Sequence, residues 1–171
     1  MILNNLPEEL KPFLEMQTKY LTFANPSSKL LPKIREILAK KDPKKISVDI
    51  ISYRFAYDGY SKDDEWFKAL AKILKEGGKI RLIGGKPSGK NLEGLKELKS
   101  LGAEIRFLSE PPVTHLFACY ENSKPIFIWF EGDHRDNVAM AVVYTDNPTE
   151  EYGKLAKEYF NKLWEMGEQI D

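Results

Sequence analysis

Apolar residues follow two different spacings along the middle of the chain. Short β-branched apolar runs alternate with longer segments in which apolar positions recur every three or four residues and which stop at glycine. The two spacings predict, in order, a strand over 46–55, a helix over 66–78, a strand over 79–84, a helix over 91–102 and a strand over 103–108. Strands that alternate with helices favour right-handed crossovers and a largely parallel sheet.

The two ends of the chain carry further elements. The first part predicts a short helix over 6–16, a strand over 19–24 and a helix over 29–40. The last part predicts a hairpin of strands 115–120 and 125–130 across a turn at 121–124, a strand over 138–145 and a helix from Asn147 to about Met166. We therefore expect an α/β fold: a mixed, centrally parallel sheet with helices on both faces. We expect one domain over 1–171, with 1–18 as an N-terminal helical extension.

Composition narrows the class of protein. The 171 residues are 42% hydrophobic, and 26 basic residues balance 26 acidic ones, so net charge gives no general affinity for nucleic acid or anionic membranes. The single cysteine, Cys119, excludes an internal disulfide and fits a reducing compartment; within an apolar strand, we expect it to be a buried small hydrophobe. No export signal or membrane span is evident, so we expect a cytoplasmic protein without membrane insertion. The Lys/Glu-rich, Cys-poor composition suits a thermophile.

A glycine-rich loop at 84–91, GGKPSGKN, approaches the phosphate-binding pattern G-x-x-x-x-G-K-[S/T] between a strand and a helix. Asn91 stands where a hydroxyl would hold Mg²⁺, which favours a tight solvated turn over a nucleotide hydrolase. Lys86 or Lys90 could still contact an anionic ligand.

The order of segments around His115 carries a family resemblance. The chain contains, in sequence, KYLTFANPSSKLLPKIREILAKK, ISVDIISYRF, KIRLIGG and GAEIRFL, followed by a proline-containing loop that leads to His115. It then ends with Asp146-Asn147-Pro148 and a helix closing on F-x-x-x-W, from Phe160 to Trp164. Taken together, this order resembles the phospholipase D-like superfamily over most of the chain.

The catalytic signature of that superfamily is H-x-K-x-x-x-x-D. Laid on this chain it gives His115, with Phe117 in the lysine position and Asn122 in the aspartate position. The resemblance implies two such motifs meeting across a pseudo-twofold or dimer axis, where one histidine attacks phosphorus and the other protonates the leaving group. It also implies that the lysines offset charge on the phosphoryl oxygens, which a phenyl ring cannot do. Asn122 likewise cannot act as a carboxylate partner for the histidine.

We therefore expect a non-catalytic ligand-binding or interaction domain that could recognise a phosphate-bearing small molecule or nucleic acid and could form a homodimer. The alternatives are a phosphodiesterase or nuclease with His115 as the catalytic residue, and a protein that interacts through its surface alone. Because ligands bind where parallel strands end, several polar residues at strand ends become candidates. The candidate ligand-binding residues are Tyr53, Arg54, Lys86, His115, Glu131, His134 and Arg135. The Glu131–Arg135 stretch also reads as a solvated turn, and two histidines without close ligand spacing predict no metal or other cofactor.

Overall fold

The computed structural model describes residues 21–23, 27–52, 59–110, 112, 114–131 and 141–171. These residues form one eight-stranded sheet and four α-helices. The strands are β1 Leu21–Phe23, β2 Ile46–Ser52, β3 Lys79–Gly85, β4 Glu104–Leu108, β5 His115–Glu121, β6 Lys124–Glu131, β7 Ala141–Thr145 and β8 Glu168–Gln169. The helices are α2 Ser27–Lys40, α3 Glu65–Lys75, α4 Gly89–Ser100 and α5 Glu150–Met166, with a 3-10 turn at Pro43–Lys45.

The sheet is mixed, as expected. Its strand order is β1-β7-β6-β5-β2-β3-β4-β8. Strands β2, β3 and β4 are parallel, and β5 pairs antiparallel with β2. Because β5 returns to the free side of β2, the parallel strands occupy one half of the sheet rather than its middle, and the β5–β6 hairpin and β7 extend the other half.

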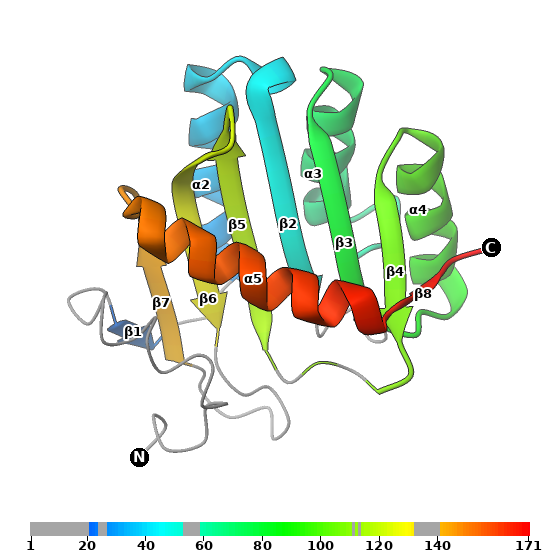
Figure 1. Cartoon of the computed structure of the whole chain (residues 1–171). Coiled ribbons are helices and arrows are strands. Elements are labelled where there is room, and N and C mark those ends of the chain that lie inside the picture. The colour runs from blue at the N-terminus through cyan, green and yellow to red at the C-terminus, as the bar shows by residue number, and fades with distance from the viewer. Residues whose placement is uncertain (1–20, 24–26, 53–58, 111, 113, 132–140) are drawn as a thin grey trace.

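Helices cover both faces of the sheet, which confirms the predicted layers. Helices α2, α3 and α4 lie on one face, and α5 runs across the other (Figure 1). Alternate residues of β2 divide between the two cores: Ile46, Val48 and Ile50 pack with the three helices, whereas Ile51 packs with α5. Both faces are therefore buried, which explains the nearly continuous apolar run of this strand.

Helix α5 packs through the F-x-x-x-W pair that its sequence suggested. The rings of Phe160 and Trp164 stack with their centroids 5.4 Å apart. The guanidinium of Arg81 lies 4.6 Å from the Phe160 ring centroid, and that of Arg106 lies 4.6 Å from the Trp164 ring centroid. Arginines on β3 and β4 therefore contact the aromatic side of the helix by cation–π interaction.

The turn between β5 and β6 confirms the predicted hairpin. Asn122 and Ser123 both have positive φ angles, 48° and 69°, as the two central residues of a type I′ turn do. The backbone N–H of Asn122 also donates to the carbonyl of Lys45 at 3.0 Å. This turn marks one end of the sheet, and His115 begins β5 at the opposite end.

Some boundaries differ from the expectation. Strand β8 was not predicted, because two residues carry no period and form a strand only by pairing with Arg106 and Phe107 of β4. Helix α4 begins at Gly89 rather than at Asn91. The helix predicted over 6–16 lies outside the described residues.

Candidate functional site

Four residues stand side by side across the sheet where β2 and β3 end. The hydrogen-bond register pairs His115 with Glu131 and Ser52 with Gly84. The last pair between β2 and β5 is Ile51 with Leu116, so Ser52 stands next to His115, one position further on. We call Glu131, His115, Ser52 and Gly84 the polar row. Residues opposite one another on neighbouring strands point to the same face, with Cβ atoms about 5 Å apart.

The polar row lies on the face covered by α2, α3 and α4. Ring contacts place it there, because the imidazole of His115 lies 6.0 Å from the indole of Trp66 on α3, in an edge-on arrangement. Ser52, His115 and Glu131 are 0%, 6% and 2% exposed. Sequence reasoning named His115 and Glu131 but missed Ser52 and Trp66.

Glu131 is held by an aromatic donor on its own strand. The indole N–H of Trp129 donates to Oε1 of Glu131 at 2.8 Å, and both side chains are buried. Residues two apart on a strand share a face, which brings this pair together. A carboxylate only accepts hydrogen bonds when ionised, so Glu131 can accept a ring proton from His115 on the next strand.

Phe117, in the lysine position of the signature, is a core residue. It is 1% exposed, and its ring centroid lies 5.9 Å from that of Trp66 and 6.1 Å from that of Phe127. The position two residues after His115 is therefore filled by aromatic packing.

Asn122, in the aspartate position, lies in the hairpin turn at the other end of β5. Asn122 is seven positions after His115 along an extended strand, a span of roughly 23 Å. No side chain at position 122 could reach the imidazole. The carboxylate opposite His115 is Glu131 instead.

Lys86 does not lie beside His115; its amine lies near Phe107, the register partner of Gly84 at the other end of the polar row. It is exposed, and its amine lies 5.8 Å from the ring centroid of Phe107 on β4. Since β4 is three strands from β5 in the sheet order, Phe107 is about 14 Å from His115. The structure thus brings together His115 and Glu131, and it sets Lys86 further along the same edge. Tyr53, Arg54, His134 and Arg135 lie outside the described residues.

The glycine-rich loop before α4 forms a turn whose asparagine faces the core. Asn91 is 9% exposed, and its side-chain oxygen accepts a hydrogen bond from the backbone N–H of Tyr60 at 3.2 Å. A Cβ atom at Gly94, one turn later, would lie 1.7 Å from the Tyr60 carbonyl oxygen. The start of α4 is therefore clamped to the segment before α3, and Asn91 has a structural role rather than that of a Mg²⁺ ligand.

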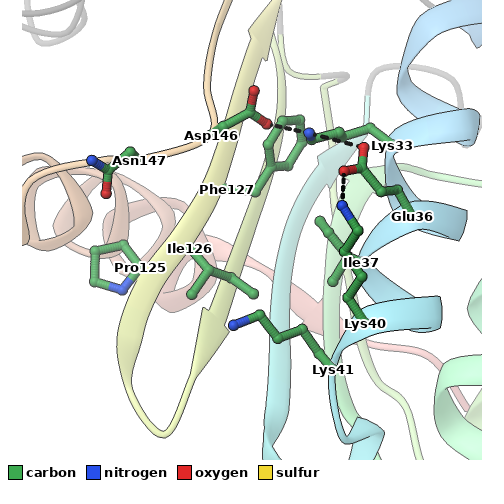
Figure 2. Close-up of a pocket in the computed structure, with 10 residues that line it drawn as sticks. All are labelled: Lys33, Glu36, Ile37, Lys40, Lys41, Pro125, Ile126, Phe127, Asp146 and Asn147. Carbon is green, nitrogen blue, oxygen red and sulfur yellow. Dashed lines mark hydrogen bonds and ion pairs between the residues drawn. The ribbon is translucent and has the colours of Figure 1, made fainter.

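A groove of about 370 Å³ lies between α2 and β6, at the opposite end of the sheet from His115. Figure 2 shows its charged rim, where Lys33 pairs with Asp146 and Glu36, and Lys40 pairs with Glu36. Hydrogen bonding to Asp146 raises the pKa of Lys33, and Lys40 and Lys33 together lower the pKa of Glu36. The positive and negative side chains of the rim pair with one another. The ion pair between Lys33 and Asp146 connects α2 to the residue that follows β7.

The described residues contain no group of three or more His, Cys, Asp or Glu side chains placed to hold a metal ion. None of their helices is long and apolar enough to cross a membrane. Cys119 is buried as predicted, and burial raises the pKa of its thiol to about 12.

Comparison with known proteins adds structural relatives. No family model matches the chain, and no curated protein matches it in sequence. Among solved structures it is similar to Nuc from Salmonella typhimurium, a phospholipase D family member, with a TM-score of 0.60 and 13% identity over 88% of this chain and 95% of Nuc. It is also similar to TrmBL2, an archaeal chromatin protein with a novel mode of DNA binding (TM-score 0.57, 18% identity, 95% of this chain and 59% of TrmBL2).

A third similar structure is polyphosphate kinase from Porphyromonas gingivalis, with a TM-score of 0.55 and 14% identity over 88% of this chain and 24% of that enzyme. The identities are too low to transfer an activity. They show the fold, and this confirms the phospholipase D-like architecture that the order of segments suggested.

Proposed function

We propose that this phospholipase D-like domain binds a phosphate-bearing ligand, a small molecule or nucleic acid, at the His115 edge of its sheet without hydrolysing it. The observation that carries the proposal is the burial of Phe117 between Trp66 and Phe127. In the related signature an ammonium group stands two residues after the histidine. Losing such a group removes electrostatic stabilisation of the transition state, of the order of several kcal/mol. Binding does not need that stabilisation.

Two exposed lysines near this edge support an anionic ligand. Lys86 follows β3, and Lys90 stands in the first turn of α4, which the structure describes in full and which carries no acidic residue. The N-terminus of a helix favours anions because its first backbone N–H groups have no partner within the helix. The similar structures are consistent with this class of ligand, since TrmBL2 is described as binding DNA.

A binding screen tests the proposal. The full chain is incubated with inorganic phosphate, nucleoside mono- and triphosphates, and single- and double-stranded oligonucleotides, and its melting temperature is measured. We expect at least one phosphate-bearing class to raise Tm, and the combined Lys86→Ala and Lys90→Ala variant to lose most of that shift. Lys75→Ala with Lys79→Ala is the matched control, because it removes the same charge from exposed positions at the opposite edge. If the ligand raised Tm equally in both double variants, the ligand would not bind at the His115 edge.

The second candidate function is phosphodiester hydrolysis. It is favoured by the register of His115 and Glu131, because a carboxylate beside an imidazole is a common arrangement for a nucleophile or general base. Incubation with bis(p-nitrophenyl) phosphate separates the candidates. We expect no turnover above background; turnover that disappears in His115→Ala would replace binding with catalysis as the function.

We include a homodimer in the proposal, because the resemblance implies that single-domain members assemble their site from two copies. Sedimentation equilibrium of the full chain, with and without the ligand found in the screen, measures the association. A mass of one chain at all concentrations would remove the dimer from the proposal and leave the ligand-binding function intact.

A further inference from the structure

A second groove lies between the β5–β6 hairpin and the first half of α5, on the face of the sheet that α5 covers. Its volume is about 540 Å³, which is within the range of sites that bind small organic molecules. We call it the hairpin groove. The residues that line it come from the end of the hairpin and from one side of the helix: Tyr120, Ser123, Lys124, Pro125, Glu150, Gly153, Lys154, Lys157 and Glu158. None of them belongs to the polar row, so this groove is separate from the His115 edge.

The apolar lining of the hairpin groove is closely packed. Gly153 allows α5 to approach the hairpin, because a Cβ atom at this position would lie 2.5 Å from Cγ of Pro125. The hydroxyl of the buried Tyr120 donates to the carbonyl oxygen of Gly153 at 3.3 Å, which fastens the helix to β5. The groove is therefore largely formed before a ligand binds, and its apolar residues suit an apolar part of that ligand.

The amine of Lys157 is held at the groove by two contacts. It lies 3.4 Å from a carboxylate oxygen of Asp49 and 4.1 Å from the ring centroid of Tyr120. Asp49 also pairs with Arg81 at 2.8 Å, so the positive charge of Lys157 is not fully neutralised by this carboxylate. An ammonium group has three N–H donors, and the two contacts use no more than two of them. Since the side chain is 39% exposed, one donor remains for a ligand.

The other charged residues of the groove are exposed. Lys124 and Lys154 form no ion pair with any other residue that the structure describes, and the same is true of Glu150 and Glu158. The three lysines and two glutamates that line the groove give it a net charge of +1. A ligand with one negative charge complements this lining. A carboxylate carries one negative charge at neutral pH, whereas a phosphate monoester carries nearly two.

We infer that the hairpin groove binds a small monocarboxylate with an apolar body. The carboxylate accepts hydrogen bonds from the lysine amines, and the apolar body lies against Pro125 and Gly153. Charge-assisted hydrogen bonds of this kind are stronger than neutral ones. The two glutamates repel a second negative charge, which separates this ligand class from the phosphate-bearing ligands proposed for the His115 edge.

Calorimetric titration and ¹H–¹⁵N spectra of the full chain test this inference. The probes are 3-phenylpropionate and octanoate, which carry the same carboxylate on an aromatic and an aliphatic body. We expect at least one of them to bind saturably, with the largest amide shift changes at Ser123, Gly153 and Lys154. The neutral amide of the bound probe should bind at least about tenfold more weakly, because it lacks the charge.

Paired variants locate the carboxylate. Lys124→Gln with Lys154→Gln should weaken binding of the probe by about tenfold, since two charged donors are lost. Both side chains are exposed, so the fold should not change. Lys75→Gln with Lys96→Gln is the matched control, because it removes two exposed lysines from α3 and α4 on the other face of the sheet. The control should bind the probe as the wild type does.

Removing the negative charges of the groove should have the opposite effect. Glu150→Gln with Glu158→Gln should strengthen binding by at least about twofold, because these carboxylates repel the anion. The inference would be overturned by equal binding of the carboxylate and its amide, by equal weakening in the two double lysine variants, or by no binding of either probe. None of these variants changes Lys86, Lys90 or His115, so each result leaves the proposed phosphate-binding function to its own screen.

Discussion

The guanidinium of Arg81 holds the carboxylate of Asp49 through two parallel hydrogen bonds of 2.8 Å each. Asp49 lies on β2 and is 3% exposed. The amine of Lys157 on α5 lies 3.4 Å from the same carboxylate, and Arg81 also donates to Asn161 of α5 at 3.1 Å. A buried charge on the sheet and polar groups on the helix therefore fix α5 across this face.

Removing the Asp49 carboxylate should destabilise the fold. Asp49→Ala leaves the half-buried guanidinium of Arg81 without its bidentate partner, and we expect a loss of about 3 kcal/mol in the free energy of unfolding. Urea denaturation measures the change. Arg35→Ala is the control, because Arg35 and Glu65 form an ion pair in which both side chains are 58% exposed, and its midpoint should stay close to wild type. Equal midpoints for the two variants would contradict a structural role for Asp49.

Local spacing was enough to predict the main elements of this fold. Each described helix, and each described strand of five or more residues, was anticipated because it buries a periodic apolar face. The pattern of a single strand does not say which strand lies beside it. The antiparallel placement of β5 against β2 therefore emerged only in the structure, and it moved the parallel strands away from the middle of the sheet.

The candidate site was predictable only in part, for the same reason. His115 and Glu131 were named separately, from a signature and from a polar loop, but their pairing depends on the register of the β5–β6 hairpin. In the sequence, Ser52 is an ordinary residue of an apolar strand. Its position beside His115 follows only from the antiparallel pairing of β5 with β2. The spacing of the signature likewise placed Asn122 in the aspartate position. In the structure, Asn122 lies in the turn after β5, at the end of the strand far from His115.

Restoring the lysine of the signature should not restore catalysis. Phe117→Lys would bury an ammonium among the rings of Trp66 and Phe127, and an unpaired buried charge is strongly unfavourable. We expect the variant to lose at least about 3 kcal/mol of unfolding free energy and to show no hydrolysis of bis(p-nitrophenyl) phosphate. Phe117→Leu, which keeps an apolar side chain, should lose less. A stable Phe117→Lys protein with new turnover would show instead that this position faces the site.

The hydrogen bond between Trp129 and Glu131 should be measurable as a coupling energy. Trp129→Phe keeps an aromatic ring but removes the N–H donor, leaving a buried carboxylate oxygen without that partner. We expect a loss of roughly 1–3 kcal/mol in unfolding free energy. Combining it with Glu131→Leu should cost less than the sum of the two single changes, since both partners are then gone. Strict additivity of the two changes in urea denaturation would argue against the bond.

Cys119 should make stability fall at alkaline pH. Burial raises the pKa of its thiol to about 12 in the folded protein, whereas the pKa of an exposed thiol is about 8.5. Between these values the unfolded chain loses a proton that the folded protein retains, so this contribution is complete below about pH 8.5 and declines as pH rises. By pH 10 the wild type should have lost about 2 kcal/mol relative to Cys119→Ala, whose other titrating groups are the same. Parallel pH profiles of the two proteins in urea denaturation would contradict the buried, protonated thiol.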